Sequence, residues 1–347
     1  MVEQRRRARR GTPLRVLHMH TVYRLAGGEE SAVAAERSML SAAGADVTVW
    51  DQRNATFAER YGWSQTAIKT VWNASTAREL ASFLRANEPF DVAHVHNTFP
   101  AMSPSIFATL KSFGVPVVRT LHNYRLSCVN ALHMRANRPC FRCLGTPFPA
   151  AGIRYACYDG SPAKASVVAL LSSAEKLLRV STRWVDRVIA LSRFSQTIFE
   201  RAGIPRHHIV VAPNTVAFEP TETSTLSGSY VFIGRLSHEK GVDLLLQTWK
   251  RLPNPPSLRI IGDGPLADDV RAAHGTSNIT WVGALQKNEV MRELLNARAL
   301  VAPSAALENC PMTVLEASAA GVPSIVPKHG AMEEMIDDGR TGWHVEP

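Results

Sequence analysis

The chain of 347 residues is 45% apolar and 20% charged, with a formal net charge of +9. These values are ordinary for globular protein and leave room for two hydrophobic cores. No stretch reaches the roughly 18 to 20 continuous apolar residues of a membrane-spanning helix. The basic start is followed by Gly11, Thr12 and Pro13 instead of the apolar stretch of a secretory signal. We therefore expect a cytoplasmic protein.

Residues 1–13 form a basic tail with five arginines. A run of like charges is usually a solvated, disordered leader, and we favour that interpretation. Attraction to the anionic inner face of a membrane is the second interpretation, which would place the protein peripherally at that surface. A nucleic-acid partner is not expected, because nothing downstream resembles a base-reading module.

From Leu14 onward, short apolar runs alternate with longer helix-like segments. The runs predicted as strands are Leu14–Met19, Asp46–Trp50, Val92–Val95, Val115–Thr120, Val188–Leu191 and Ile209–Val211. The segments predicted as helices include Glu29–Ala43, Ser64–Asn87 and Ser192–Ala202. Alternating strands and helices with apolar strands predict a parallel sheet covered on both faces.

The same alternation begins again after a small, polar stretch at 217–229, which we interpret as a linker. The second set of predicted strands is Tyr230–Ile233, Leu258–Ile261, Ile279–Val282, Ala299–Ala302 and Ser324–Val326, with helices after Gly241, Pro265 and Pro311. The sequence therefore predicts an α/β protein with two Rossmann-like domains, 14–216 and 230–347. Such domains in tandem face a cleft, and parallel sheets bind ligands beyond the carboxyl ends of their strands.

In each domain, the loop that follows the first strand contains two glycines. Gly27 and Gly28 open a helix whose free N–H groups suit a phosphate, although paired glycines are also common in turns and the spaced dinucleotide fingerprint is absent. In the second domain, Gly234 and Gly241 enclose Arg235 and Lys240. Two cations on a strand-to-helix loop can hold a diphosphate, while the plainer interpretation is a polar loop with incidental charges.

A third loop carries two glutamates, Glu308 and Glu316, on either side of a predicted helix start at Pro311. Carboxylates accept hydrogen bonds from sugar hydroxyls, whereas Glu316 could equally be an ordinary helical glutamate. Small residues around Glu316 indicate close packing, where a carboxylate needs a partner. No Asp-x-Asp triplet occurs in the chain, so Arg235 and Lys240 would supply charge that a divalent ion supplies elsewhere.

Histidines end two strands of the first domain. His94 and His96 flank Val95 and share one face, so they are candidates for acceptor contacts, metal ligands or a hydrogen-bonded structural role. No third ligand is evident from the sequence, and a catalytic metal is not expected there. His122 follows the Val115–Thr120 strand and is the stronger active-site candidate.

Four of the five cysteines lie in an irregular, Arg-, Pro- and Gly-rich insertion at 128–160: Cys128, Cys140, Cys143 and Cys157. Four thiolates can close a tetrahedral structural zinc site, but only one Cys-x-x-Cys pair is present. Unlinked cysteines and a disulfide are the alternatives, of which a disulfide is the least expected in a reducing compartment.

The order and spacing of these motifs resemble the family 4 retaining glycosyltransferases of group 1, which have the GT-B fold. The matching motifs are Gly27-Gly28-Glu29, His94-Val95-His96, Thr120-Leu121-His122-Asn123, Gly234-Arg235-Leu236 with Glu239-Lys240-Gly241, Gly262-Asp263-Gly264-Pro265, the pair Glu308 and Glu316, and Gly339-Arg340-Thr341-Gly342. The resemblance implies a retaining, nucleotide-sugar-dependent hexosyltransferase with no metal or other cofactor for catalysis.

The resemblance also assigns roles to residues of this chain. Arg235 and Lys240 would neutralise the departing diphosphate, Glu308 would bind the transferred sugar, and His122 would position it. The remaining donor-binding residues implied are Gly27, Gly28, Gly234, Val282, Cys310, Pro311, Met312, Thr313 and Glu316. The residues implied on the acceptor side are His94, His96 and Asn123, with a glycan or lipid-linked acceptor of the cell envelope.

The chain departs from the family pattern in two respects. Asn309-Cys310 replaces the Gly-aromatic pair that often follows the first glutamate, and Pro347 comes just after the Gly339–Gly342 turn. The resemblance therefore predicts a second domain without its last helices. Two other functions share the fold: a phosphorylase or epimerase, and a non-catalytic nucleotide-sugar binder. The retained Arg235, Lys240, Glu308 and Glu316 favour transfer, since fold alone does not decide.

Overall fold

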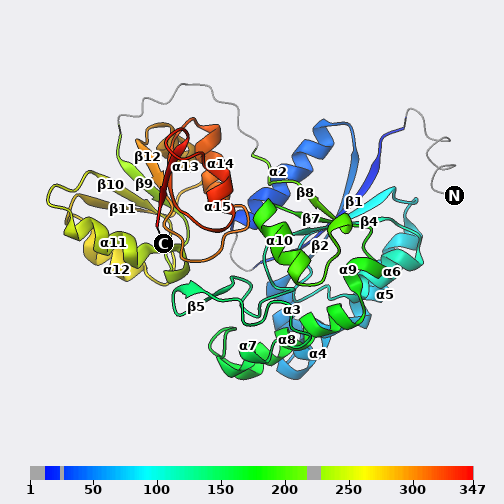
Figure 1. The fold of residues 1–347 in the computed structure, drawn as a ribbon. Coiled ribbons are helices and arrows are strands. Elements are labelled where there is room, and N and C mark those ends of the chain that lie inside the picture. The colour runs from blue at the N-terminus through cyan, green and yellow to red at the C-terminus, as the bar shows by residue number, and fades with distance from the viewer. Residues whose placement is uncertain (1–11, 24–26, 217–227, 347) are drawn as a thin grey trace. The chain divides into compact units, whose positions relative to one another are not determined.

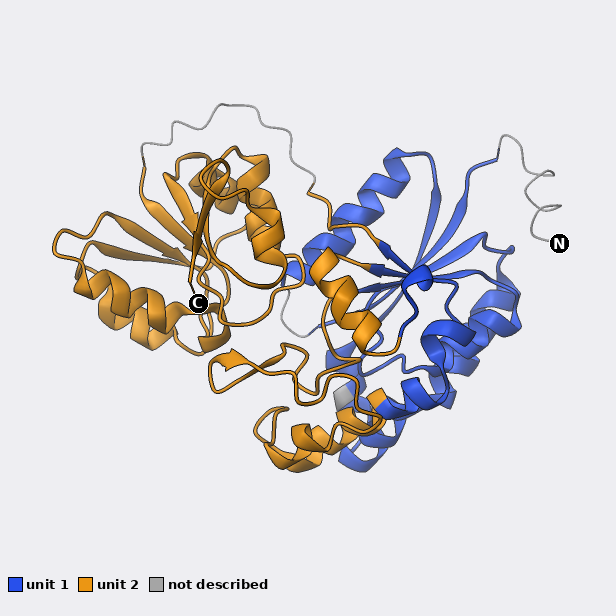
Figure 2. Ribbon diagram, viewed as in Figure 1, with its two compact units in different colours: residues 1–121, 173–189, 204–210 blue, residues 122–172, 190–203, 211–347 orange. Residues whose placement is uncertain are grey.

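Two six-stranded sheets organise the chain (Figure 1). The computed structural model describes residues 12–23, 27–216 and 228–346. Most of the predicted basic tail, residues 24–26 before Gly27 and most of the predicted linker therefore lie outside the described residues. The residues group into two compact units, one of 1–121, 173–189 and 204–210 and one of 122–172, 190–203 and 211–347 (Figure 2). The predicted first domain contributes segments to both units.

The first sheet has the strand order β2-β1-β3-β4-β7-β8. Its strands are β1 (Arg15–Val22), β2 (Asp46–Arg53), β3 (Val92–Val95), β4 (Val117–Leu121), β7 (Arg187–Ala190) and β8 (Ile209–Val211). The pairings of β1 with β2 and β3, and of β3 with β4, are parallel. Buried residues such as Leu17, Met19 and Val95 fill these strands, as expected for a parallel sheet covered on both faces.

The segments between these strands are largely helical. The helices are α2 (Gly28–Ala42), α3 (Asn54–Arg60), α4 (Trp63–Val71), α5 (Ala74–Ala86), α6 (Ser105–Ser112), α7 (Ala150–Arg154), α8 (Pro162–Leu177), α9 (Val180–Arg183), α10 (Arg193–Arg201) and the 3₁₀ turn η1 (Arg206–His208). Within the described residues, none of the helices has both the length and the apolar character needed to cross a bilayer.

The predicted helix Ser64–Asn87 is two helices, α4 and α5, and the prediction of one element is wrong. Trp72 has extended backbone between them, and the side chain of Asn73 accepts a hydrogen bond from Thr76 N at 3.2 Å. Asn73 thereby caps a new helix, because its side chain replaces the acceptor that the first turn lacks.

The predicted insertion at 128–160 contains little regular structure. A two-residue hairpin, β5 (Met134–Arg135) with β6 (Arg138–Pro139), and the short α7 are its elements among the described residues. Several of its non-glycine residues have positive φ, among them Ala131, His133 and Ala156. Such backbone is costly and persists where surrounding contacts hold it.

The second sheet has the order β11-β10-β9-β12-β13-β14. Its strands are β9 (Tyr230–Ile233), β10 (Leu258–Ile261), β11 (Ile279–Gly283), β12 (Ala299–Val301), β13 (Ser324–Pro327) and β14 (Gly342–Val345). Numbered from β9, this is the 3-2-1-4-5-6 order of nucleotide-binding Rossmann folds, whose direction reverses between the first and fourth strands. That switch point lies between β9 and β12, where a ligand site is expected.

Helices cover the two faces of this sheet. They are α11 (Val242–Arg251), α12 (Ala267–Ala273), α13 (Lys287–Leu295), α14 (Met312–Ala319), α15 (Gly330–Met335) and the 3₁₀ turn η2 (His238–Lys240). One buried cluster, around Leu236, Leu258 and Val270, packs with α11 and α12, and another, around Leu300 and Val314, packs with α13 and α14. These cores fix the strand ends from which the loops of the candidate site emerge.

Candidate active site

The loops that follow β9 and β12 meet through an ion pair. Lys240, at the end of η2, donates from Nζ to Glu308 Oε1 at 2.6 Å. Glu308 lies between β12 and α14, and β9 and β12 are paired in parallel. The two predicted catalytic residues therefore meet at the switch point of a Rossmann sheet, where such sheets bind ligands.

Backbone contacts hold the two loops together. Glu239 O accepts hydrogen bonds from Ala305 N at 3.0 Å and Ala306 N at 3.2 Å, and Ser304 Oγ lies 2.8 Å from both Glu239 O and Glu308 Oε1. Gly241 has φ of +73°, and a Cβ there would lie 2.0 Å from Pro303 O. Only glycine allows this approach, so Lys240 is presented to Glu308 from a fixed turn.

The electrostatics of the pair favour its charged form. Burial would raise the pKa of Glu308, but Lys240 and the hydrogen bond from Ser304 hold it below the ordinary value of 4.5. A carboxyl group whose pKa is lowered by folding stabilises the folded protein at any pH above its pKa in the unfolded chain. That stabilisation is lost as the pH falls through its pKa in the folded protein. The Glu308 carboxyl group is therefore ionised at neutral pH.

The loop after β4 contributes a contact to Glu308 within the second unit. Tyr124 OH donates to Glu308 O at 3.3 Å, and burial raises the pKa of Tyr124, so its hydroxyl stays protonated. His122 and Asn123 are half-buried and directly precede it, and Asn123 Oδ1 accepts from Arg125 N at 3.1 Å. The predicted His122–Asn123 motif thus reaches the Glu308 loop through its next residue.

The start of α14 carries the other predicted donor-binding residues. Asn214 Nδ2 donates to Cys310 O at 3.2 Å, and Pro311 is the N-cap of the helix that contains Met312 and Thr313. Glu316 is only 6% exposed, and burial raises its pKa, which Lys287 opposes. A buried carboxyl group needs polar partners.

The remaining donor-side predictions lie at strand ends of the same sheet. Arg235 is exposed and follows Gly234 directly after β9, and Val282 lies half-buried in β11. A Cβ at Gly262 would lie 1.9 Å from Gly234 O, so the loops after β9 and β10 approach backbone to backbone. This packing leaves the exposed guanidinium of Arg235 as the second cation on the β9 loop.

Cys310 is expected to react slowly with iodoacetamide in the folded protein. Burial raises the pKa of its thiol from 9.0 to about 11. At pH 8 the thiolate fraction is then about 100-fold lower than in the unfolded chain, and the thiolate is the reactive form. Timed alkylation followed by peptide mass spectrometry measures this rate, with urea-unfolded protein as the control. Equal rates in the two states would contradict the burial of Cys310.

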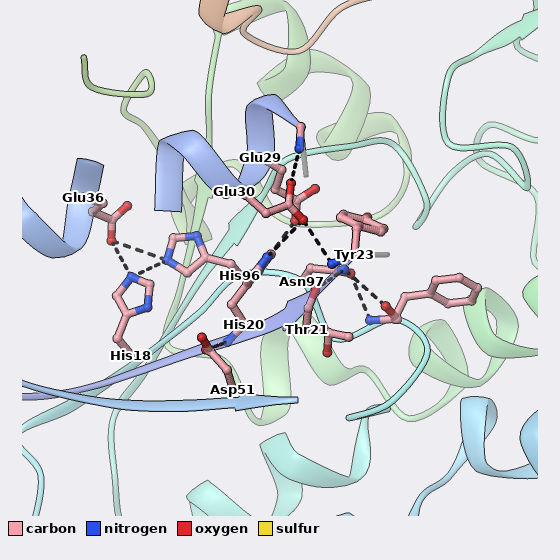
Figure 3. A network of polar contacts seen from close by, with 12 residues as sticks. His18, His20, Thr21, Tyr23, Glu29, Glu30, Glu36, Asp51, His96 and Asn97 are labelled. Atoms are coloured by element: carbon pink, nitrogen blue, oxygen red, sulfur yellow. Dashed lines mark hydrogen bonds and ion pairs between the residues drawn. The ribbon is translucent and has the colours of Figure 1, made fainter. Parts of the chain in front are cut away.

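The glycine loop and the paired histidines lie in the first unit. Gly27 is the N-cap of α2, and its N–H donates to Glu30 Oε2 at 2.8 Å, so this amide is already bonded within the chain. His94 and His96 are joined by His18 and Glu36, two residues that sequence reasoning did not select. Figure 3 shows His18, Glu36 and His96 of this cluster. The fold thus places two further potential ligands, which the sequence did not reveal, beside His94 and His96.

The four clustered cysteines are free thiols. They line one small cavity together with Val129, Gly152 and Tyr155. Cys128 Sγ donates to Asn130 Oδ1 at 2.9 Å, and burial raises the pKa of this thiol to about 11. Among the described residues, however, the potential metal ligands whose atoms all lie within 4.8 Å of one another are His18, Glu36, His94 and His96. The four thiols do not form such a group. Zinc at the cysteines stays a prediction.

Sequence reasoning missed three residues that support the candidate active site. Ser304 and Tyr124 contact Glu308, and Glu334 accepts hydrogen bonds from Arg193 N at 2.7 Å and Phe194 N at 3.0 Å. Glu334 thus caps the N-terminus of α10, where a negative charge is favourable. Tyr124 could have been found by its position three residues after β4, whereas nothing in the sequence marks Ser304 or Glu334.

Comparisons with known proteins agree with this architecture. HepE of Anabaena, solved in complex with UDP, aligns over 96% of this chain and 86% of its own with a TM-score of 0.60 at 16% identity. The same protein has been solved with UDP-glucose. At this identity the likeness concerns the fold, and the two parallel six-stranded sheets place the chain in the GT-B class.

The family follows from the sequence models that match. Residues 27–215 match the model described as glycosyl transferase 4-like domain, and residues 228–347 match glycosyl transferases group 1. The chain belongs to this family of glycosyltransferases. The family and fold implied by the motifs are thereby confirmed.

Two curated relatives are similar over part of the chain. The sulfoquinovosyl transferase SQD2 of Arabidopsis thaliana is 28% identical over 120 residues, 34% of this chain and 23% of its own length. An uncharacterised 41.2 kDa protein in the cps region of Klebsiella pneumoniae is 27% identical over 180 residues, 48% of this chain and 49% of its own length. The chain spans less than half the length of either relative.

Proposed function

We propose that the protein transfers a hexose from a nucleotide-sugar donor to a glycan or lipid-linked acceptor, with retention of configuration. The observation that carries this proposal is the Lys240–Glu308 pair at the switch point of the second sheet. Membership of the glycosyltransferase family and the UDP-sugar complexes of HepE support a nucleotide-sugar donor.

Lys240 would act as the cation for the leaving diphosphate. An ammonium group has three N–H donors, and one of them is engaged by Glu308 Oε1. The other two can bind phosphate oxygens, with the exposed Arg235 as a second cation. Preorganised positive charge at the place where negative charge develops lowers the barrier without a metal ion. Metal-independent transfer is therefore part of the proposal.

Glu308, His122 and Glu316 would hold the sugar and nucleotide. The second oxygen of the Glu308 carboxylate can accept from a sugar hydroxyl, His122 would lie near the transferred sugar, and Glu316 would accept from the ribose. In the retaining step the bond between the sugar C1 and the diphosphate oxygen breaks. The acceptor oxygen bonds to C1 from the same face, and the acceptor proton passes to a diphosphate oxygen.

The acceptor and location complete the proposal. The similarity to a protein of a capsule-region gene cluster supports an envelope or exported polysaccharide. We propose a cytoplasmic enzyme that contacts the membrane surface peripherally through its basic residues when the acceptor is lipid-linked. Asn123 is the acceptor-side residue kept in this proposal, because His94 and His96 are buried in the first unit.

Turnover of one nucleotide sugar without added metal is the expected result for purified full-length protein. A panel of UDP-, GDP- and ADP-sugars is assayed for binding and slow hydrolysis, with magnesium, with manganese, and with a chelator added at the start of a short assay. The rates should agree within error, because Arg235 and Lys240 provide the charge. A rate that depends on magnesium or manganese would overturn metal independence, and absence of binding by every donor would overturn the transferase proposal.

A further inference from the structure

A second cluster of ionisable side chains lies in the first unit. β1 and β3 are neighbours, and His18 is paired in register with His94. Residues two apart on a strand share a face, so the His94 and His96 side chains lie on the same side of the sheet. Figure 3 shows Glu36, from α2, directed at His18 and His96.

The four ligand atoms converge within the fold. Glu36 Oε1 lies 2.5 Å from His94 Nδ1 and 3.5 Å from both His18 Nε2 and His96 Nε2, and these last two nitrogens are 2.9 Å apart. All four atoms lie within 4.8 Å of one another. His18 is fully buried, His96 is 2% exposed, and Glu36 Oε1 is a buried atom. Three imidazoles therefore crowd one carboxylate oxygen.

We propose that His18, Glu36, His94 and His96 bind one divalent transition-metal ion, with Zn²⁺ the best fit. Three imidazole nitrogens and one carboxylate oxygen are ligands that zinc prefers. With zinc-to-ligand distances of about 2.0–2.2 Å, ligand atoms at the corners of a tetrahedron lie about 3.3–3.5 Å apart. Four of the six separations are 2.5–3.5 Å and all lie within 4.8 Å, so on binding the shortest would lengthen and any beyond the tetrahedral range would shorten.

The contacts outside the four ligands agree with this assignment at His94. His94 Nε2 lies 2.7 Å from Thr120 Oγ1, so a ring that ligates through Nδ1 can donate its other N–H to that hydroxyl. Metal-bound histidines almost always have such an outer partner, which fixes the tautomer and the ring orientation.

His18 imposes a condition on metal binding. Arg37 Nε lies 3.1 Å from His18 Nδ1, and because a guanidinium only donates, the neutral ring carries its proton on Nε2. For Nε2 to ligate as a neutral ring, the proton must appear on Nδ1 and Arg37 must withdraw. Arg37 has another partner, since its Nη2 lies 2.7 and 2.9 Å from the two oxygens of Asp51. Removing Arg37 should therefore not weaken metal binding.

The ion would be structural. Four protein ligands leave no position open for water or substrate, which is the arrangement of structural zinc sites. It would tie the middle of α2 to β1 and β3, and α2 begins at Gly28, in the loop that follows β1. The proposal depends on the geometry of the first unit alone and is separate from the proposed transfer reaction.

Cobalt titration of the chelator-treated full-length protein tests the site. We expect this site to take up one Co²⁺ with the visible absorption of four-coordinate cobalt and to release it to Zn²⁺, while any cobalt held by thiols is recognised separately by its near-ultraviolet sulfur charge-transfer band. Glu36→Gln and His96→Ala should each weaken binding at least 100-fold. His207→Ala is the control, since His207 does not belong to the cluster, and this variant should bind as the unchanged protein does.

Two further variants keep the proposal testable if a ligand variant fails to fold. Thr120→Val retains all four ligands and should weaken Co²⁺ binding about 10- to 100-fold by removing the partner of His94. Arg37→Met should bind at least as tightly as the unchanged protein, and loss of binding in it would overturn the four-ligand assignment. Absence of cobalt uptake, or uptake that both Glu36→Gln and His96→Ala leave unchanged, would overturn the site itself.

Discussion

Lys240→Ala is expected to lower kcat for transfer or donor hydrolysis by about 100- to 1,000-fold, the usual loss when one preorganised donor to developing charge is removed. The cation at the leaving diphosphate disappears, while the turn that carries it is held by Glu239 O and Gly241. Steady-state kinetics with the donor identified from the panel measure the effect.

The control for Lys240 is Lys250→Ala, which removes an exposed lysine of the last turn of α11 and should leave kcat unchanged. Because Lys240→Ala also leaves the Glu308 carboxylate without its cation, the double variant Lys240→Ala with Glu308→Gln is compared by thermal unfolding. It should recover stability without recovering kcat. Full activity of a folded Lys240→Ala protein would contradict the assignment of Lys240 to the active site.

Breaking the ion pair between Arg119 and Glu175 is expected to have the largest effect on stability. Arg119 of β4 donates through two guanidinium nitrogens to the carboxylate of Glu175 in α8, at 2.6 and 3.1 Å. The side chains are 7% and 4% exposed. Removing one partner of such a buried pair costs about 3–5 kcal/mol, since the other charge stays buried. We therefore expect Glu175→Gln to lower the free energy of unfolding of the first unit by about this much.

Hydrogen exchange of the β4 amides, measured in urea, reports the free energy of unfolding of the first unit separately from that of the second. Arg119→Met with Glu175→Leu removes both charges and should restore most of the stability, because apolar replacements of a buried pair are often neutral. Asp46→Asn is the exposed control, where the contact with Arg15 is worth about 0–1 kcal/mol. A change below about 1 kcal/mol in Glu175→Gln would contradict a buried, coupled pair.

Much of the fold could be predicted because its strands are short, continuous apolar runs. Tyr230–Ile233, Leu258–Ile261 and Val92–Val95 have the predicted bounds. The break at Asn73 was missed because the apolar spacing continues across it, and a cap is a local hydrogen bond that periodicity does not report. The order of the strands could not be predicted from the apolar pattern either, because that pattern does not show which strands pair.

The site was predicted as separate residues, not as contacts. Glycines and cations after β9 indicated phosphate binding, but no spacing in the sequence shows that Lys240 meets Glu308. That contact requires β9 and β12 to be adjacent. The same holds for the metal cluster: His18 and Glu36 join His94 and His96 only because β1 pairs with β3 and α2 packs over them. The repeated His-x-His pattern on two strands was the signal available.

The pairing of β9 with β12 also affects the order in which contacts form as the protein folds. The Lys240–Glu308 contact joins residues 68 positions apart, and contacts of long sequence separation form late because loop closure costs entropy. The Glu308 loop is synthesised only after β9, β10 and β11. A growing chain therefore contains four of the six strands of its second sheet before Lys240 can contact Glu308. Donor binding should be among the last properties acquired during refolding, which makes it a natural reporter of completed folding.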